Sequence, residues 1–437
     1  MQRINALQFF HIVRYAAFVL LGVVLAKGGF SLAQIGAYEN LIFTSGLVTF
    51  FGVGAVTNAL LSLYGRADEE QKNNLLYNTF LMLLGGSILV SCLLLCYAML
   101  PLRFVEEREI TQTGNSTVAL LAGAYILFNV PAFINEYLLY LRGRYQALVG
   151  YAIISAVATV LLAILLFSLT NQEPLFAAAY AFTSVAVGKF IYSLYLLKRY
   201  AIYRPNYALL QQHIRMALPL LFALLISGSS EYVDGWIVGE YFSKERFAIY
   251  RYGAKELPVL LIVANTFSAA MLPVVSANLQ NGLEVVKKGS AKMMHWMFPL
   301  TIVLLLISRY AYRYVFSAEF EEAHLVFDVY LLLIIPRLVF PQSILTALGK
   351  TKYILMSSVI EIILNTSLSL VFAYWWGLKG IALGTLVAFC ADKLFLATVC
   401  YLKEGISPKK YIPIKILMLY SIAVLSCYVL STFVFSG

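Results

Sequence analysis

The chain contains 437 residues, of which 61% are hydrophobic and 12% are charged, and its formal net charge is +10. Soluble domains carry about 25% charged residues, so this composition excludes a soluble enzyme, a secreted disulfide-linked protein and a disordered chain. It predicts a protein surrounded mainly by lipid. The excess of basic residues then indicates Lys and Arg in cytoplasmic loops of a membrane protein rather than nucleic-acid binding.

Apolar windows long enough to cross a bilayer as a helix, which takes about 20 residues, recur about thirteen times. Lipid offers no hydrogen-bond partner to the backbone, so each window is predicted to be helical. The expected fold class is an all-α polytopic membrane protein with about 13 transmembrane helices. The predicted spans are 8–28, 34–64, 76–101, 117–141, 147–170, 174–198, 214–239, 254–279, 292–315, 323–346, 353–376, 380–402 and 412–435.

The basic residues between these spans predict an orientation. With the N-terminus in the cytoplasm, the cytoplasmic loops and flanks hold about 19 Lys and Arg, and those on the other side hold about 10. Because basic residues favour cytoplasmic loops, we expect a multi-pass protein with a cytoplasmic N-terminus. No loop is long enough for a soluble catalytic domain, so an enzyme is not expected.

Neither a metal nor a cofactor is expected. The five cysteines lie in apolar runs and no histidine accompanies them at a spacing typical of a metal site. Gly349-Lys350-Thr351 resembles the end of a phosphate-binding loop, but that motif needs a glycine at position 344, which is Ile.

The two halves of the chain resemble each other in the same direction, at offsets that drift between 204 and 212 residues. Each match is short, but the four occur in the same order and at the same place in a six-span unit, which is typical of parallel internal repeats. The matched pairs are Phe30–Glu39 with Phe242–Arg251, Pro131 with Pro336, Leu141–Tyr145 with Ala347–Thr351, and Lys189 with Lys393.

This repeat predicts the domain organisation. Residues 1–198 form an N-terminal six-helix bundle, 199–213 a cytoplasmic linker and 214–405 a C-terminal six-helix bundle. Residues 406–437 hold an extra C-terminal transmembrane helix without a counterpart in the first half.

The two six-span halves, the Phe-Ser-x-x-x-x-[Gly/Ala]-x-Tyr turn after the first span of each, the loop at Ala347–Lys352 and the stretch Glu231–Phe242 resemble the polysaccharide transporter family. That family belongs to the multidrug/oligosaccharidyl-lipid/polysaccharide exporter superfamily. The resemblance implies a Wzx-type flippase, a secondary transporter of the bacterial inner membrane. Such a protein moves an undecaprenyl-diphosphate-linked oligosaccharide from the cytoplasmic to the periplasmic leaflet by alternating access, for O-antigen, capsule or exopolysaccharide synthesis. A polysaccharide polymerase and a chain-length regulator would be its further partners.

Ionisable residues inside spans are costly and usually face a cavity or a partner. We predict a cavity between the halves whose cationic side chains bind the diphosphate, since Arg offers paired donors to phosphate and Lys a point charge. Arg251 and Lys255 are four residues apart and would share a helix face. The predicted substrate-binding residues are Arg14, Arg251, Lys255, Arg337, Lys189 and Lys393.

A structural role stays open for each of these cations. Arg14 could extend to the membrane surface, and Lys189 could serve packing. Arg251 and Lys255 could pair with Glu256, Glu231 or Asp234, and Lys393 could pair with Asp392.

We expect the membrane potential to contribute to export, because an anion leaving a negative interior gains about 2.3 kcal/mol per charge per 100 mV. Ion exchange would supplement it. The predicted ion-coupling residues are Glu231, Asp234 and Glu361.

Three other functions stay open. A lipid II flippase is close to this family, and a multidrug or cation exporter belongs to the same superfamily but would favour an acidic cavity. A membrane polysaccharide polymerase would need a larger outer loop than the chain has.

Overall fold

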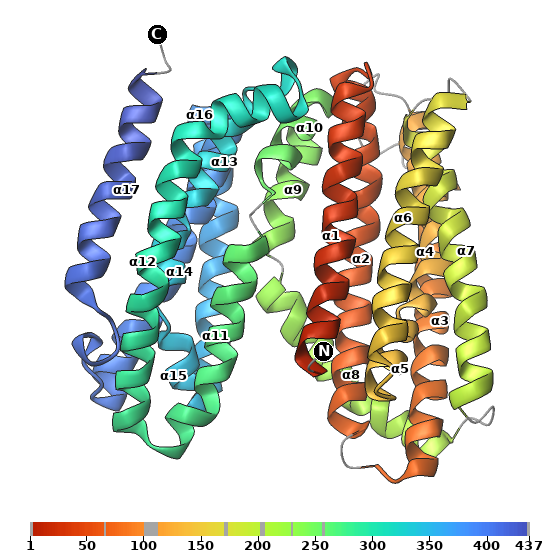
Figure 1. The fold of residues 1–437 in the computed structure, drawn as a ribbon, viewed down its shortest axis with the longest axis horizontal. Helices are drawn as coiled ribbons and strands as arrows, with labels where there is room; N and C mark the ends of the chain where they lie inside the picture. Colours follow the sequence, from red (N-terminus) through yellow and green to blue (C-terminus); the bar gives the residue numbers. More distant parts are fainter. Residues whose placement is uncertain are drawn as a thin grey trace. The chain divides into compact units, whose positions relative to one another are not determined.

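The computed structural model describes residues 3–64, 67–99, 112–169, 174–201, 206–228, 230–255 and 258–434, and these residues form helices without a strand (Figure 1). The chain divides into two compact units, residues 1–225 and 226–437. We describe each unit by itself. The contact boundary falls within the span predicted at 214–239, 12 residues after the end of the predicted linker at 213.

Unit 1 consists of long apolar helices that run side by side, drawn from red to yellow-green in Figure 1. α3 packs on α4, α1 on α6, and α4 on α7. Leu60, Leu76, Ile126 and Leu138 are fully buried where these helices meet, and they form the core of the unit. The helices are α1 (Arg3–Lys27), α2 (Leu32–Tyr64), α3 (Glu69–Met99), α4 (Gln112–Ala132), α5 (Ile134–Leu141), α6 (Tyr145–Leu169), α7 (Pro174–Tyr200) and α8 (Tyr207–Gly228).

Unit 2 holds more interrupted helices, drawn from green to blue in Figure 1. The helices are α9 (Ser230–Tyr241), α10 (Lys244–Gly253), α11 (Pro258–Ala277), α12 (Leu279–Ala311), α13 (Ala323–Leu332), α14 (Ile334–Arg337), α15 (Pro341–Ala347), α16 (Thr351–Glu404) and α17 (Ile414–Val434).

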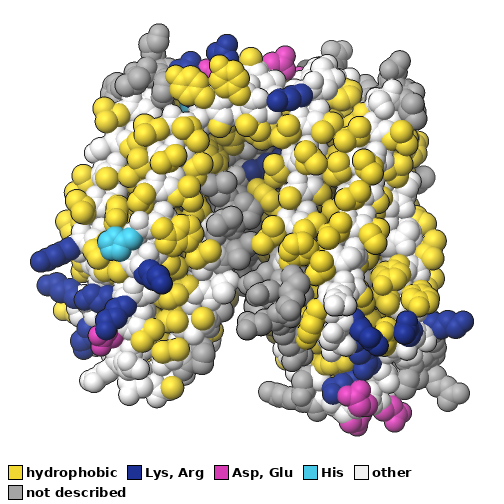
Figure 2. Space-filling view, in the orientation of Figure 1, with side chains coloured by type: hydrophobic (Ala, Val, Ile, Leu, Met, Phe, Trp, Pro, Cys, Tyr) yellow, Lys and Arg dark blue, Asp and Glu magenta, His cyan; other side chains and the backbone are white. Residues whose placement is uncertain are grey.

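The predicted all-α polytopic fold is confirmed. Among the described residues, nine helices are long and apolar enough to cross a membrane, or ten if α13–α15, which bend by 45°, count as one span. The other predicted spans are shorter or merged helices: 214–239 corresponds to α8 and α9, 254–279 to α11, and α16 contains both 353–376 and 380–402. Hydrophobic side chains cover the middle of the visible face of each unit and charged ones gather toward its ends (Figure 2).

The break within α16 lies at Gly377, whose φ of 56° and ψ of −135° are not helical. Residues with a side chain rarely adopt a positive φ, so glycine permits the turn. The three residues before it are aromatic and exposed, with exposed fractions of 88% for Tyr374, 60% for Trp375 and 54% for Trp376.

The same local backbone structure recurs at the matched positions of the predicted repeat. Gly143 follows α5 with a φ of 69°, and Gly349 follows α15 with a φ of 72°. The next amide in each turn donates to a carbonyl five residues earlier: Arg144 N to Leu139 O, and Lys350 N to Leu345 O, both at 2.8 Å. Such turns satisfy the free carbonyl groups at a helix end. They support the predicted duplication.

The last helix, α17, packs against α12 within unit 2. His295 Nδ1 lies 2.9 Å from the Tyr420 hydroxyl, and the rings of Phe298 and Tyr420 stack with centroids 5.2 Å apart. α17 corresponds to the extra C-terminal helix predicted at 412–435.

Candidate functional site

A buried carboxylate lies at the centre of a polar cluster in unit 2. Asp234 on α9 is 2% exposed. The Tyr330 hydroxyl donates to Asp234 Oδ2 at 3.0 Å, and the Thr385 hydroxyl donates to the same oxygen. Ser369 Oγ lies 3.1 Å from Asp234 Oδ1. α13 and α16 thus bring three neutral hydroxyl groups to this carboxylate.

The cluster around Asp234 contains more oxygen atoms that can accept a hydrogen bond than protons that can be donated to them. Ser369 Oγ also lies 3.0 Å from Asn365 Oδ1 and 3.2 Å from Ile381 O, and Thr385 Oγ lies 3.2 Å from Asn365 Oδ1. A hydroxyl group carries one proton and can donate only once. Several of these close oxygen pairs are therefore without a proton between them, although the Asn365 side chain also hydrogen-bonds to the Asp234 carboxylate. Carboxylate, amide and hydroxyl oxygens are the ligand types that a small hard cation takes.

Asp234 was predicted from the sequence, but the residues around it were not. Asn365 and Ser369 are four residues apart on α16 and so share one face. Polar residues at this spacing inside an apolar run were the available signal. Glu361 lies one turn before Asn365 and is half-buried, whereas the side chain of Glu231 lies outside the described residues.

The structure corrects the pairing of Arg251 with Lys255. α10 ends at Gly253 and α11 begins at Pro258, so the two residues do not share a helix face. Residues before a proline avoid the helical region, which favours a break at this point. Lys255 instead lies over the Tyr252 ring, with Nζ 4.1 Å from its centroid.

The other two predicted cations of unit 2 meet at one aromatic ring. Arg337 lies 5.7 Å and Lys393 Nζ 4.6 Å from the centroid of the Phe389 ring. Lys393 Nζ also lies 2.9 Å from Asp392 Oδ2. The local pair that the sequence left open for Lys393 is therefore formed.

In unit 1, Arg14 and Lys189 lie near a buried carboxylate, Glu136. Arg14 on α1 is half-buried and its guanidinium lies 5.3 Å from the Phe133 ring centroid. Lys189 on α7 is also half-buried. Both charges act on Glu136, which follows Phe133 by three residues at the start of α5. We call these three residues, Arg14, Glu136 and Lys189, the unit 1 triad.

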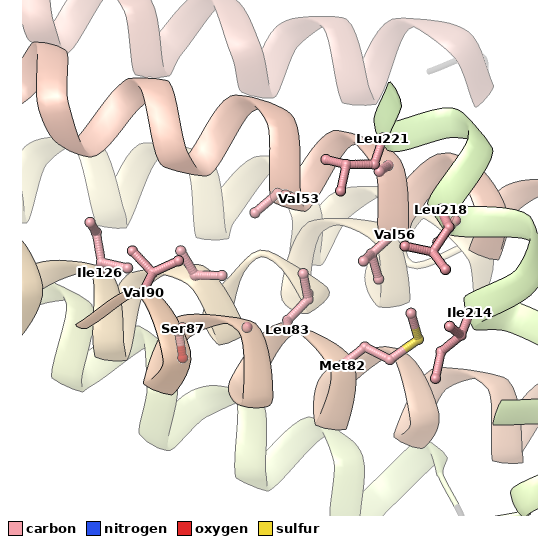
Figure 3. A pocket seen from close by; sticks show the side chains of 15 residues that line it. Val53, Val56, Met82, Leu83, Ser87, Val90, Ile126, Ile214, Leu218 and Leu221 are labelled. Carbon is pink, nitrogen blue, oxygen red and sulfur yellow. The ribbon is translucent and has the colours of Figure 1, made fainter. Parts of the chain in front are cut away.

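An apolar cavity of about 200 Å³ lies in unit 1 between α2, α3, α4 and α8 (Figure 3). Gly52 and Gly86 contribute to its wall, and a Cβ atom added at either would meet no neighbour within 4 Å. The Ser87 hydroxyl at its edge already donates to Leu84 O at 2.8 Å. The lining therefore suits hydrocarbon and offers nothing to a sugar.

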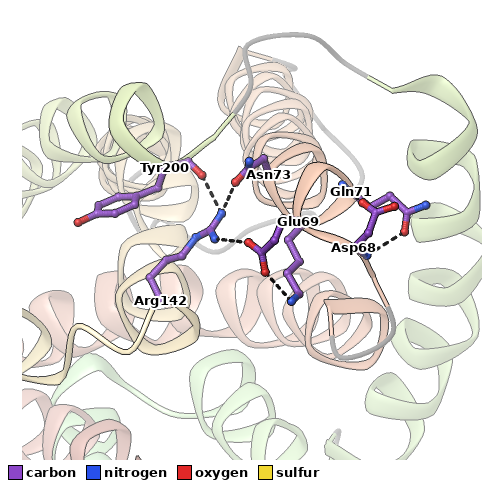
Figure 4. A network of polar contacts seen from close by, with 7 residues as sticks. Asp68, Glu69, Gln71, Asn73, Arg142 and Tyr200 are labelled. Atoms are coloured by element: carbon purple, nitrogen blue, oxygen red, sulfur yellow. Dashed lines mark hydrogen bonds and ion pairs between the residues drawn. The ribbon is translucent and has the colours of Figure 1, made fainter.

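A polar network around Arg142 at one end of unit 1 serves to join helices (Figure 4). Arg142 donates to Glu69 Oε2 at 3.3 Å, to Tyr200 O at 3.0 Å and to the Asn73 side chain. It thereby links the ends of α3, α5 and α7. Glu69 also accepts from Lys72 at 2.8 Å.

Comparisons with known proteins show one family and one fold. The family described as "Lipid II flippase MurJ" matches residues 43–436. The solved structure of a lipid II flippase MurJ in an inward closed conformation shares 17% identity with a TM-score of 0.73, covering 98% of this chain and 93% of that one. Among curated proteins no match is found.

Two further solved structures share the fold. A transporter of the MOP superfamily from Pyrococcus furiosus, described as having a binding pocket of reverse polarity, shares 13% identity with a TM-score of 0.60, covering 92% of this chain and 94% of that one. A multidrug transporter of the MATE family, DinF-BH, solved as a complex, shares 18% identity with a TM-score of 0.59, covering 91% of this chain and 94% of that one.

Proposed function

We propose that this chain, which belongs to the lipid II flippase MurJ family, moves lipid II across the bacterial inner membrane. The observation that carries the proposal is the family match over residues 43–436. A flippase is a transporter and not an enzyme, so the family match also supports a transport function. We propose lipid II as the cargo, the inner membrane as the location and an orientation with the N-terminus in the cytoplasm.

The family match favours the lipid II alternative over the O-antigen cargo that the sequence resemblance placed first. Both cargoes carry a diphosphate on a long prenyl chain and differ in their sugars. The predicted cationic residues address the shared part of the two molecules. They support a lipid-linked diphosphate, and the family match supports lipid II among such molecules.

The mechanism we propose is alternating access with the prenyl chain left in lipid. The diphosphate would be bound by the predicted cations of unit 1, Arg14 and Lys189, whose charge offsets its own. In unit 2, Lys393 is already paired with Asp392, which leaves Arg251, Lys255 and Arg337 as the predicted cations of a separate, alternative anion site. The apolar cavity of unit 1 does not take part in binding the headgroup, because its lining is hydrocarbon.

We further propose that Asp234 couples transport to a cation. Its carboxylate and the side-chain oxygens of Asn365, Ser369 and Thr385 form a shell that a sodium ion or a proton would complete. Buried ionisable groups in spans usually mark such pathways. The membrane potential would add to the driving force, since an outward-moving anion gains free energy from it.

Complementation tests the cargo. We expect the chain to restore growth to a bacterial strain depleted of its own lipid II flippase. A strain lacking its O-antigen flippase serves as the control and should stay without O-antigen. If the chain restores O-antigen in the second strain but not growth in the first, lipid II is rejected as the cargo and an O-antigen flippase is supported. Restoration in neither, with unchanged membrane abundance and a gain in drug resistance, would favour a drug exporter.

A further inference from the structure

Glu136 is the most deeply buried member of the unit 1 triad. It is 2% exposed, and its Oε2 has no hydrogen-bond partner. The neighbouring Asn135 is fully buried, and its Oδ1 also has no partner. Buried polar oxygens are nearly always hydrogen-bonded. Two adjacent exceptions between α1, α5 and α7 therefore indicate a site that gains a proton or a donor during function.

The surroundings of the triad are fixed by neutral contacts. Asn135 Nδ2 donates to Lys189 O at 3.0 Å and lies 3.2 Å from the Tyr151 hydroxyl. Lys189 O also accepts from the Ser193 hydroxyl at 2.9 Å. These bonds hold α5, α6 and α7 together without using the charges of Arg14 or Glu136. The charges are thus available for another task.

The charge count of the triad is unbalanced. With Glu136 ionised, two cations face one carboxylate and a single positive charge remains. With Glu136 protonated, two positive charges remain, which matches the two negative charges of a diphosphate diester. An ionised carboxylate beside a bound phosphate would instead be repelled, because like charges in a poorly solvated site interact strongly.

We propose that the unit 1 triad is a proton-linked anion site, in which Glu136 takes up one proton from water when Arg14 and Lys189 bind the diphosphate of the cargo. Release of the diphosphate returns the proton to water, and the carboxylate again compensates the two cations. The inference rests on the proposed function. The proton taken up by Glu136 in unit 1 is distinct from the cation that we propose at Asp234 in unit 2.

Other titratable groups near Glu136 fit this assignment. α3 contributes Glu69 and Lys72, which are engaged with each other, and Glu69 also pairs with Arg142 at one end of the unit. The tyrosines near the triad stay neutral near pH 7. The titratable groups that interact with Glu136 are Arg14 from α1, Tyr137 from α5, Tyr151 from α6 and Lys189 from α7. His11 from α1 and Tyr125 from α4 interact with Arg14.

Calorimetric titration of the purified full-length protein with farnesyl diphosphate tests the proposal. The titration is run at a pH above the last ionisation of the probe's own phosphates, and two buffers of different ionisation enthalpy then report the protons that the protein binds per probe. We expect the protein to take up about one proton for each probe molecule bound. The affinity for the probe should fall about tenfold for each unit by which the pH rises. Glu136→Gln should bind the probe without proton uptake, with an affinity that does not change with pH. Farnesol, which lacks the phosphates, should cause no proton uptake.

Asp328→Asn is the matched control. Asp328 in unit 2 is likewise buried, 3% exposed, with an oxygen that has no partner, so this variant should keep the proton uptake. Wild-type binding without proton uptake, absent binding, or uptake that persists in Glu136→Gln would overturn the proposal. If Glu136→Gln does not fold, infrared difference spectra of the wild type and of Asp234→Asn decide, because the probe must induce the band of a protonated carboxyl group in both.

The inference and the proposed function fail separately. Proton-linked binding in a chain that does not complement would reject lipid II transport alone. Complementation by a chain that binds the probe without taking up a proton would reject only the role of the triad.

Discussion

The two units solve the problem of a buried carboxylate in different ways. In unit 2, hydroxyl groups of Tyr330, Ser369 and Thr385 surround Asp234. In unit 1, two cations act on Glu136 and one of its oxygens has no partner. A hydroxyl shell can exchange its carboxylate proton for a cation, whereas a cationic surrounding attracts an anion. If the roles proposed for the two clusters hold, unit 2 binds a cation where unit 1 binds an anion.

The proposed difference between the two units is tested most directly at Asp234. Asp234→Asn keeps the shape of the side chain but removes the charge that would hold a cation. We expect the lipid II flipping rate in proteoliposomes under an ion gradient to fall by about 100-fold, within the usual range of coupling energies. Asp328→Asn should leave the rate within about twofold of wild type. An unchanged rate in Asp234→Asn would show that unit 2 does not couple.

A second test concerns the helix break in unit 2. By the offset that relates Tyr38 to Tyr250, Gly253 corresponds to Leu41, which is buried within the continuous helix α2. A Cβ atom at Gly253 would lie 2.7 Å from Val326 Cβ and would also meet Ala323 O. Gly253→Ala should therefore lower the free energy of unfolding by about 2 kcal/mol.

Thermal unfolding in detergent measures this effect. Gly150→Ala on α6 is its control, because a Cβ atom there meets nothing within 4 Å. That variant should keep or slightly raise the melting temperature, since alanine favours helix. Equal melting temperatures for both variants would contradict the close packing of α10 on α13.

The two lysines at matched repeat positions sharpen the comparison. Lys189 belongs to the unit 1 triad, while Lys393 is paired with Asp392 at 2.9 Å. Lys189→Met should weaken the binding of farnesyl diphosphate by about tenfold, the loss of one bond to a charged group. Lys393→Met should change it by less than about twofold. Calorimetry compares both, and the reverse order would move the anion site to unit 2.

The smallest effect is expected at a half-buried ion pair whose carboxyl group, on Glu321, lies beyond the end of the span Leu279–Phe316. Arg309 donates to Glu321 at 2.6 Å and lowers the pKa of that carboxyl group. A lowered pKa means that the pair stabilises the fold above the ordinary pKa of Glu, and that this contribution disappears as the pH falls through the lowered value. Melting temperatures of wild type and Glu321→Gln should differ slightly at neutral pH and converge in acid.

Hydropathy and turn chemistry made most of the fold predictable. Apolar windows predict helices because lipid leaves no other backbone structure, and Gly143 and Gly349 mark the turns. The break between Gly253 and Pro258 was readable in the sequence, yet the spacing of Arg251 and Lys255 was interpreted as one continuous helix. A helical spacing carries no information on whether the helix continues.

The site was less predictable. Asp234 stands out in the sequence as a carboxylate within a predicted span, but Ser369 and Thr385 are ordinary residues of membrane helices and lie more than 130 residues away. Only the packing of α9 on α16 brings them together. The charged residues alone did not distinguish lipid II from O-antigen, because the two cargoes share the charged group that the cations address. The family match over residues 43–436 is what favours lipid II.

The exposed aromatic residues before Gly377 have a consequence for the choice of lipid. Tryptophan and tyrosine prefer the headgroup level of a bilayer, so we expect the exposed Trp375 and Trp376 to hold this bend at that level. Lipids with longer or shorter acyl chains shift the headgroup level relative to the protein and would therefore strain the bend to different degrees. Bilayer thickness thereby becomes a variable of activity in reconstituted vesicles.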